Sequence, residues 1–356
     1  MEPYRLIIDG KKVPTKQCYE VLNPATEQVA GLAPLGTEKD LKEAIRAAKI
    51  AYKSWRNETH RKRQTACRKI AEKLEQQAEE IALLLTAEQG KPLNGMGSRW
   101  EVGGAIAWTQ YTSTLDLPVK ILQDGPGGRV EQHRKPIGVV GSITPWNFPL
   151  LIAVWHVIPA VLAGNTVVIK PSPYTPLTTL RLVELINEVL PRGVVNCVTG
   201  DDDLGPLITN HPDIGKIVFT GSIETGKRIY ANAASTMKRL TLELGGNDGL
   251  RGLPVNLMRA NLVEMIELAQ AAGAQVILTG IQIPPNYGPR YTLPFFNTYA
   301  GLAKKKSLPL VPFLIEGIPQ QPELMQNDGI HPRAEAQLMI LDNVWPILKP
   351  QLDRLL

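Results

Sequence analysis

Two stretches of the sequence combine residue types that suit the binding of a nucleotide. The apolar segment 216–220 runs into Gly221 and Ser222, and a helix is predicted to begin directly after them. The free N–H groups and the positive dipole end of a helix N-terminus suit a phosphate. Lys170 ends a second apolar segment, and parallel sheets bind ligands at the carboxyl ends of their strands. The alternatives are an ordinary strand-to-helix turn, whose spacing is not GxGxxG, and an ordinary strand-end lysine.

Two other stretches suit the hydrolysis of an acyl bond. Asp328 lies three residues before His331, so the imidazole could act as a general base whose tautomer the carboxylate fixes. Gly246 and Asn247 follow an apolar strand, where the amide could donate a hydrogen bond to an oxyanion. The alternatives are a surface turn that caps a helix at Asp328 and a plain strand-end turn at Gly246.

The order of the elements that must position these residues predicts an α/β protein. From residue 137 onwards, apolar β-type segments alternate with segments of helical periodicity, which indicates a doubly wound, mostly parallel, Rossmann-like sheet. Thr37 is the expected N-cap of an earlier helix, and Asp9-Gly10 is the expected turn of a hairpin. Helices are predicted over 37–56, 60–90 and 97–115, and hairpins over 5–13 and 118–135.

Composition restricts the classes of function. The formal charge of +5 comes from 39 basic and 34 acidic residues scattered along the chain, so no nucleic-acid partner is expected. Cys18, Cys67 and Cys197 fit neither a disulfide framework nor the spacing of a metal site, which favours reduced thiols and no metal. The sequence has no run of 18 apolar residues and no recognisable leader, so we expect a cytoplasmic protein without a membrane partner.

Four motifs together resemble those of the aldehyde dehydrogenase superfamily. They are Ile-Thr-Pro-Trp-Asn-Phe-Pro at 143–149, Lys-Pro-Ser at 170–172, Phe-Thr-Gly-Ser at 219–222 and Leu-Glu-Leu-Gly-Gly at 242–246. The resemblance covers residues 5–248 and implies a domain that binds NAD(P), with 118–135 as an oligomerisation hairpin. The residues it assigns to the cofactor site are Trp146, Asn147, Lys170, Ser172, Gly221, Ser222 and Glu243.

The same resemblance implies individual roles and shows two departures. Asn147 is similar to the oxyanion donor of the family and Lys170 to the contact of the adenosine ribose. Ser222 corresponds to a pyrophosphate contact, and Glu243 to the general base. However, Pro173 stands where many members have a ribose-binding Glu, and no Cys follows Cys197 to serve as the nucleophile. Since a thiohemiacetal requires a thiolate, hydride transfer from an aldehyde is not expected.

Residues 242–356 resemble the second half of the SGNH (GDSL-type) hydrolases, on Leu-Glu-Leu-Gly-Gly-Asn-Asp at 242–248 and Asn-Asp-Gly-Ile-His-Pro at 327–332. This resemblance implies a flavodoxin-type half-domain, with Gly246 and Asn247 at the oxyanion and Asp328 and His331 in a triad. The nucleophile-bearing first half of that family is missing. The chain therefore reads as a chimera of two regions, 1–248 and 249–356.

These observations lead to three candidate functions. The first is a carboxylic ester hydrolase, in which Ser222 replaces the missing nucleophile, His331 is the base and Asp328 orients it. It would need no cofactor and would act on a small acyl ester or thioester. The second is an NAD(P)-dependent oxidoreductase of the aldehyde dehydrogenase class, and the third is an inactive NAD-binding protein. The sequence favours the first, and the retained hairpin makes a homo-oligomer possible.

Overall fold

The computed structural model describes two compact units. One comprises Met1–Thr220 and Asn232–Leu242, and the other comprises Gly221–Ala231 and Glu243–Leu356; we call them unit 1 and unit 2. The boundary expected between residues 248 and 249 lies outside the described part of the chain. The described residues are 2–125, 127–234, 236–244, 254–271, 275–283, 288–325, 332 and 334–353.

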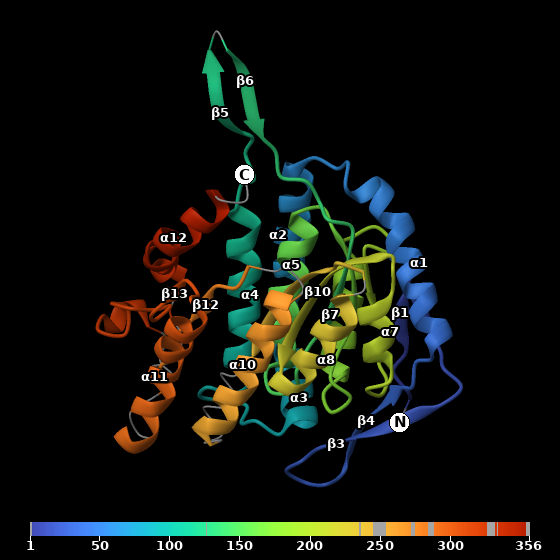
Figure 1. The fold of residues 1–356 in the computed structure, drawn as a ribbon. Helices are drawn as coiled ribbons and strands as arrows, with labels where there is room; N and C mark the ends of the chain where they lie inside the picture. Colours follow the sequence, from blue (N-terminus) through green and yellow to red (C-terminus); the bar gives the residue numbers. More distant parts are fainter. Residues whose placement is uncertain are drawn as a thin grey trace. The chain divides into compact units, whose positions relative to one another are not determined.

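A seven-stranded sheet in the order β11-β10-β7-β8-β9-β1-β2 is the centre of unit 1 (Figure 1). The pairs β10–β7, β7–β8 and β8–β9 are parallel, whereas β1 pairs antiparallel with both β9 and β2. This confirms the expected α/β fold with a largely parallel sheet. The strands span Leu6–Ile8 (β1), Lys11–Val13 (β2), Val139–Ile143 (β7), Thr166–Lys170 (β8), Val195–Cys197 (β9), Ile214–Gly221 (β10) and Arg239–Leu244 (β11).

The strand order contains a reversal that marks a ligand-binding edge. Along the chain, β7, β8 and β9 proceed in one direction across the sheet, and β10 then returns to the other side of β7. Parallel sheets bind ligands at the carboxyl ends of the strands where the order reverses. Ligand-binding residues are therefore expected directly after β7 and directly after β10.

Apolar sequence and capping residues explain the helices around this sheet. β8 is buried along its whole length, as expected of a parallel strand covered on both faces. Thr37 caps α1 through a reciprocal capping box with Asp40, as the sequence predicted. The single helix expected over 60–90 is interrupted at Gln77, which leaves the helical region of φ and ψ. The helices are α1 (Glu38–Trp55), α2 (His60–Gln76), α3 (Ala78–Gln89), α4 (Ser98–Thr114), α5 (Pro149–Leu162), α6 (Leu177–Asn187) and α7 (Leu204–Asn210).

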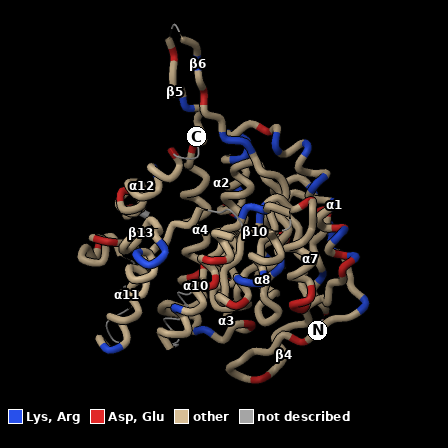
Figure 2. Tube along the Cα trace, in the orientation of Figure 1, with Lys and Arg blue, Asp and Glu red and all other residues tan. Residues whose placement is uncertain are grey.

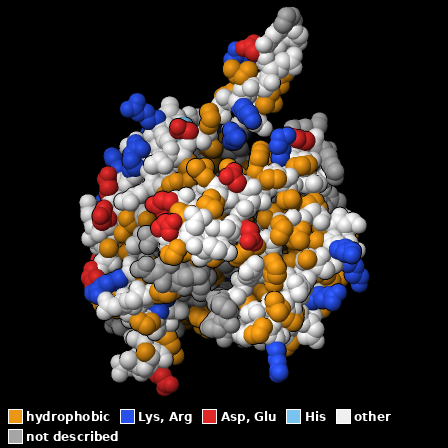
Figure 3. Space-filling model, turned by 90° about the vertical axis from the view of Figure 1, so that its left-hand side faces the viewer, with side chains coloured by type: hydrophobic (Ala, Val, Ile, Leu, Met, Phe, Trp, Pro, Cys, Tyr) orange, Lys and Arg blue, Asp and Glu red, His pale blue; other side chains and the backbone are white. Residues whose placement is uncertain are grey.

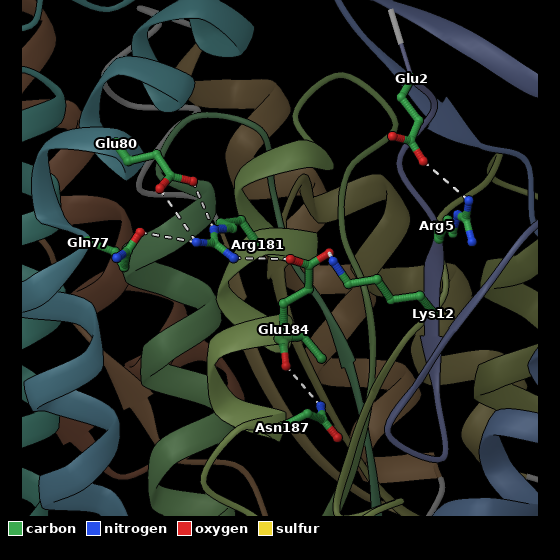
Figure 4. Close-up of polar contacts among 9 residues, drawn as sticks. Glu2, Arg5, Lys12, Gln77, Glu80, Arg181, Glu184 and Asn187 are labelled. Carbon is green, nitrogen blue, oxygen red and sulfur yellow. Dashed lines mark hydrogen bonds and ion pairs between the residues drawn. The ribbon is translucent and has the colours of Figure 1, made fainter.

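A polar cluster fastens α6 to the α2–α3 junction. Arg181 donates to Glu80 at 3.0 Å, to Gln77 at 3.1 Å and to Glu184 at 3.1 Å (Figure 4). Glu184 also pairs with Lys12 of β2 at 3.0 Å. The cluster therefore joins three separate elements of unit 1. Elsewhere on unit 1 the charges of both signs are interspersed, for example along α1 (Figure 2).

Two short antiparallel ribbons complete unit 1. β3 (Cys18–Leu22) pairs with β4 (Val29–Pro34), and β5 (Lys120–Gly125) pairs with β6 (Gly128–Gln132). The second ribbon confirms the predicted hairpin, and every described residue of both strands is exposed. Apolar side chains lie along it (Figure 3); they include Ile121, Leu122 and Val130.

Unit 2 has its own apolar core. Ile223, Met258 and Phe295 are buried in one cluster that joins α8, α10 and α11. The segments β12 (Leu278–Thr279) and β13 (Leu310–Val311) pair in parallel. The helices are α8 (Ile223–Ala234), α10 (Val255–Ala271), α11 (Pro289–Lys306) and α12 (Gln337–Asp353). Within the described ranges, no helix is both long and apolar enough to cross a membrane.

Candidate functional site

Two loops of unit 1 meet at the carboxyl edge of the sheet. One is residues 144–148 between β7 and α5, and the other is residues 171–176 between β8 and α6. The backbone N–H of Thr144 donates to the carbonyl oxygen of Lys170 at 3.2 Å. The hydroxyl of Thr175 donates to the carbonyl of Trp146 at 3.4 Å. Two of the motifs recognised in the sequence are therefore neighbours in space.

Lys170 places a buried ammonium group at the end of β8. The residue is 3% exposed, and its Nζ donates to the carbonyl of Pro171 at 3.4 Å. No carboxylate of the described residues lies within ion-pair distance of this Nζ. Burial lowers the pKa of Lys170, while the carboxylates of Asp202 and Asp201 act in the opposite direction. A charged donor held at a strand end suits a hydroxyl or phosphate oxygen of a ligand.

The loop after β8 is shaped by Ser172. This residue is buried, and its Oγ accepts a hydrogen bond from the backbone N–H of Tyr174 at 3.3 Å. Pro173 lies in this turn, between Ser172 and Tyr174. Ser172 therefore stabilises the turn within this loop.

Asn147 and Trp146 lie in the loop after β7. The Oδ1 of Asn147 accepts a hydrogen bond from the backbone N–H of Phe148 at 3.0 Å. The backbone carbonyl of Asn147 accepts from the Nζ of Lys91 at 2.7 Å. Trp146 is 43% exposed. The sequence predicted both residues for the site and did not predict the link of Asn147 to Lys91.

Two buried glutamates occupy the N-termini of the helices that follow β7 and β8. Glu101 accepts from the N–H groups of Leu150 and Leu151, in the first turn of α5, at 2.9 and 3.0 Å. Glu88 accepts from Leu177 at 2.7 Å and from Thr178 at 3.0 Å, at the start of α6. Both helix dipoles are therefore already met by a carboxylate, which disfavours a phosphate at either helix.

The helix that follows β10 begins differently. The Oγ of Ser222 accepts from the N–H of Thr225 at 3.2 Å and donates to its hydroxyl at 3.0 Å. Ser222 is thus an uncharged N-cap of α8, and Glu224 places a carboxylate in the first turn of this helix. A Cβ added to Gly226 would lie 2.5 Å from Leu244 Cδ1, so glycine permits the close packing of α8 on β11. Gly221 precedes the cap at the end of β10.

An imidazole links the two strands at the reversal of strand order. Ring nitrogens of His156, on α5, lie 2.9 Å from the Oγ of Ser142 on β7 and 3.2 Å from the Oγ1 of Thr220 on β10. Burial lowers the pKa of His156 to about 3, so the ring stays neutral. The link from His156 to Thr220 depends on tertiary structure, and the sequence did not predict it.

The remaining predicted site residues are distributed as follows. Glu243 is an exposed residue of β11 in unit 2. Gly246, Asn247, Asp328 and His331 lie outside the described residues, so their predicted roles are untested by the geometry. Within the described residues, Trp146, Asn147, Lys170 and Ser172 come together in unit 1, whereas Gly221, Ser222 and Glu243 belong to unit 2.

Comparison with known proteins identifies the family. Residues 11–251 match the model of the aldehyde dehydrogenase family, and the chain belongs to that family. A probable aldehyde dehydrogenase of Pseudomonas sp is 41% identical over 245 residues, which cover 69% of this chain and 50% of that protein. Phenylacetaldehyde dehydrogenase of Pseudomonas fluorescens is 38% identical over 259 residues, 68% of this chain and 51% of its own length.

Solved structures give the same assignment. A point mutant of betaine aldehyde dehydrogenase from Staphylococcus aureus, in complex with NAD+, matches with a TM-score of 0.66 and 36% identity. The match covers 69% of this chain and 52% of that one. The chain thus spans about half the length of the relatives it matches. Residues 204–338 also match the model of the GDSL-like lipase/acylhydrolase family, which confirms that both resemblances seen in the sequence are present.

The preference for a carboxylic ester hydrolase is wrong. The relatives and the solved structures that match most of this chain are aldehyde dehydrogenases. The hydrolase model matches a shorter region, part of which the dehydrogenase model also covers. The pair Asp328 and His331 indicated a hydrolase, whereas the longer set of cofactor motifs indicated the family that the comparisons identify. In the structure, Ser222 forms a helix cap.

Glu88 generates a pH-dependent contribution to stability. Burial raises its pKa from 4.5 to about 7. The folded state therefore holds a proton that the unfolded state has released, and stability falls as the pH rises from about 4.5 to 7. Relative to Glu88→Gln, the free energy of unfolding of the wild type should fall by about 2 kcal/mol between pH 5 and 8.

Urea unfolding of both proteins at several pH values measures this difference. The exposed Glu75 of α2 provides the control, since Glu75→Gln removes a carboxylate of the same type without a buried cap. A difference between wild type and Glu88→Gln that stays constant from pH 5 to 8 would contradict the assignment.

Proposed function

We propose that this chain provides the NAD(P)-binding half of an oxidoreductase of the aldehyde dehydrogenase class. The observation that carries the proposal is the buried Lys170 ammonium beside the Trp146–Asn147 loop, at the carboxyl edge of a sheet with reversed strand order. The same arrangement is expected of a dinucleotide site in an open parallel sheet. The related structure that contains NAD+ supports it.

The donors present fit such a cofactor. Lys170, in unit 1, would donate to a ribose hydroxyl. Ser222, in unit 2, is proposed as a pyrophosphate contact from its place in the Phe-Thr-Gly-Ser motif. Glu101 and Glu88 already cap the N-termini of α5 and α6, which disfavours a phosphate at either helix. When bound, the nicotinamide supplies the hydride acceptor of the class. Asn147 would provide an amide donor, and Glu243 a carboxylate base.

The thiols of this chain do not complete the chemistry. Cys67 and Cys197 are buried, and burial raises the pKa of Cys67 to about 12 and raises that of Cys197 as well. Cys18 is exposed on β3 and belongs to none of the four sequence motifs that were assigned to the cofactor site. A thiolate is the nucleophile that a covalent aldehyde adduct requires. We therefore assign cofactor binding to these 356 residues and leave aldehyde oxidation to a protein that also supplies the thiol.

Two further parts of the proposal concern architecture. Unit 2 has α helices around a parallel β12–β13 pair, which supports a flavodoxin-type half-domain like that of the acylhydrolases, in fold alone. The β5–β6 hairpin has two unpaired edges and exposed apolar side chains, which favour pairing with a second copy of the chain. Both are proposals about structure and leave the assigned function unchanged.

Binding of NAD+ and NADP+ tests the assignment of Lys170. Lys170→Met removes a charged donor worth about 1.5–3 kcal/mol in a hydrogen bond, so the dissociation constant should rise about 10- to 100-fold. Isothermal titration calorimetry measures the change. Lys53→Met removes an exposed lysine of α1 and should leave the affinity unchanged. Absence of binding by the wild type to either dinucleotide would refute the proposed function.

The thiol argument has a separate test. In the folded protein, a thiol reagent should modify Cys18 rapidly and Cys67 and Cys197 only after denaturation, because the latter two are buried and predominantly protonated. Peptide mass mapping identifies the modified residue. Incubation with NAD+ and an aldehyde should produce no NADH. Rapid labelling of Cys197, or steady NADH production that Cys18→Ser abolishes, would overturn this conclusion.

A further inference from the structure

We propose that Lys91 and Glu101 act together as positioning residues that hold the Trp146–Asn147 loop in place before a cofactor arrives. The consequence for ligand binding rests on the proposed function, but the effect on the loop does not. Neither residue belongs to a sequence motif that we connected with the site. The contacts that carry the inference all lie within unit 1.

Lys91 reaches the loop from outside the sheet. Its side chain is 10% exposed, and its Nζ contacts Glu101 Oε2 at 2.5 Å and the carbonyl oxygen of Asn147 at 2.7 Å. The same Nζ lies 4.0 Å from the centroid of the Phe148 ring. An ammonium has three donors and a compact charge, so one group can satisfy a carboxylate and a carbonyl and also face a ring.

Glu101 divides its two oxygens between two tasks. Oε1 accepts from the N–H groups of Leu150 and Leu151, and Oε2 accepts from Lys91. Its side chain is fully buried, so the two charges depend on each other for compensation. The pair thus connects the carbonyl of Asn147 to the first turn of α5. Lys91 binds the start of segment 147–151, and Glu101 binds its end.

Both residues of the pair are held by helices that lie between β2 and β7 in the chain. Lys91 follows Gly90, the left-handed C-cap of α3, and its own N–H donates to the side chain of Gln89 at 3.0 Å. Glu101 lies in α4, and the adjacent Trp100 packs edge-on against Phe148 with ring centroids 6.1 Å apart. The N-terminal helices therefore fix a loop of the dinucleotide site, although they contribute no strand to the sheet.

A double variant separates positioning from folding. Removing one charge alone leaves the other buried without its partner, which destabilises the fold itself. Lys91→Met/Glu101→Gln removes both charges, keeps the apolar stem and leaves a Gln oxygen that can still cap α5. What this variant lacks is the donor to the Asn147 carbonyl.

The readout is the signal of Trp146 in the ligand-free protein. With 5-fluorotryptophan incorporated, ¹⁹F NMR gives one line per tryptophan, and Trp146→Phe and Trp55→Phe assign two of them. We expect the Trp146 line of the double variant to move toward the position of free 5-fluorotryptophan, while that of the buried Trp55 stays unchanged. The dissociation constant for NAD+ should rise about tenfold.

Two further variants sharpen the test. Lys91→Arg keeps a charged donor and should give a Trp146 line close to that of the wild type. The exposed pair Glu58 and Lys62, with 2.6 Å between charges, provides the matched control Lys62→Met/Glu58→Gln. This control should leave both tryptophan lines and the affinity unchanged.

Three outcomes overturn the inference. One is a folded double variant whose Trp146 line matches the wild type. Another is a Lys91→Arg protein that is perturbed as strongly as the double variant. The third is that neither the double variant nor Lys91→Arg folds, because the pair would then be required for folding and not only for the position of the loop. If the Trp146 line moves but the wild type binds no dinucleotide, the positioning role stands and the proposed function fails.

Discussion

The burial of charge beside helix N-termini is the constraint on which the site depends. A carboxylate withdrawn from water is costly unless hydrogen bonds or an opposite charge compensate it. Glu101 is compensated by two backbone N–H groups and by Lys91, and Glu88 by two backbone N–H groups. The loops after β7 and β8 can then turn sharply at the sheet edge without leaving the helix ends unsatisfied. Lys170 is the exception, since a backbone carbonyl at 3.4 Å is the single hydrogen bond found for its Nζ among the described residues.

The sequence allowed the strands, the helices and half of the site to be predicted. The alternation of apolar and helical segments predicted the parallel sheet, and Asp9 and Gly10 adopt positive φ at the predicted turn. The motifs containing Asn147 and Lys170 were also recognised. Lys91, Glu101 and His156 were not assigned to the site, because their contacts span 10 to 64 positions in sequence. A single sequence contains no signal for such pairs, and apolar periodicity does not distinguish a core histidine from one that bridges strands.

The division between cofactor binding and covalent chemistry follows from the thiols. The family to which the chain belongs is matched over residues 11–251, and this region contains every cysteine of the chain. Each buried thiol is stabilised in its neutral form, which suits packing against the sheet and opposes nucleophilic attack. The hydrolase-like pair Asp328 and His331 gave a chemically reasonable alternative because acid–base residues are easily recognised in isolation. Longer sets of motifs proved more informative than a single pair.

The bridge from Ser142 through His156 to Thr220 has a directional property. A neutral imidazole has one N–H donor and one acceptor nitrogen, so one hydroxyl accepts a hydrogen bond from the ring while the other donates one to it. Two proton arrangements satisfy this condition, and they differ in which strand carries the donor. Conversion between them rotates two hydroxyl hydrogens and transfers the ring proton, with every heavy atom left in place. The direction of the two hydrogen bonds between β7 and β10 is therefore not determined by the positions of the carbon, nitrogen and oxygen atoms.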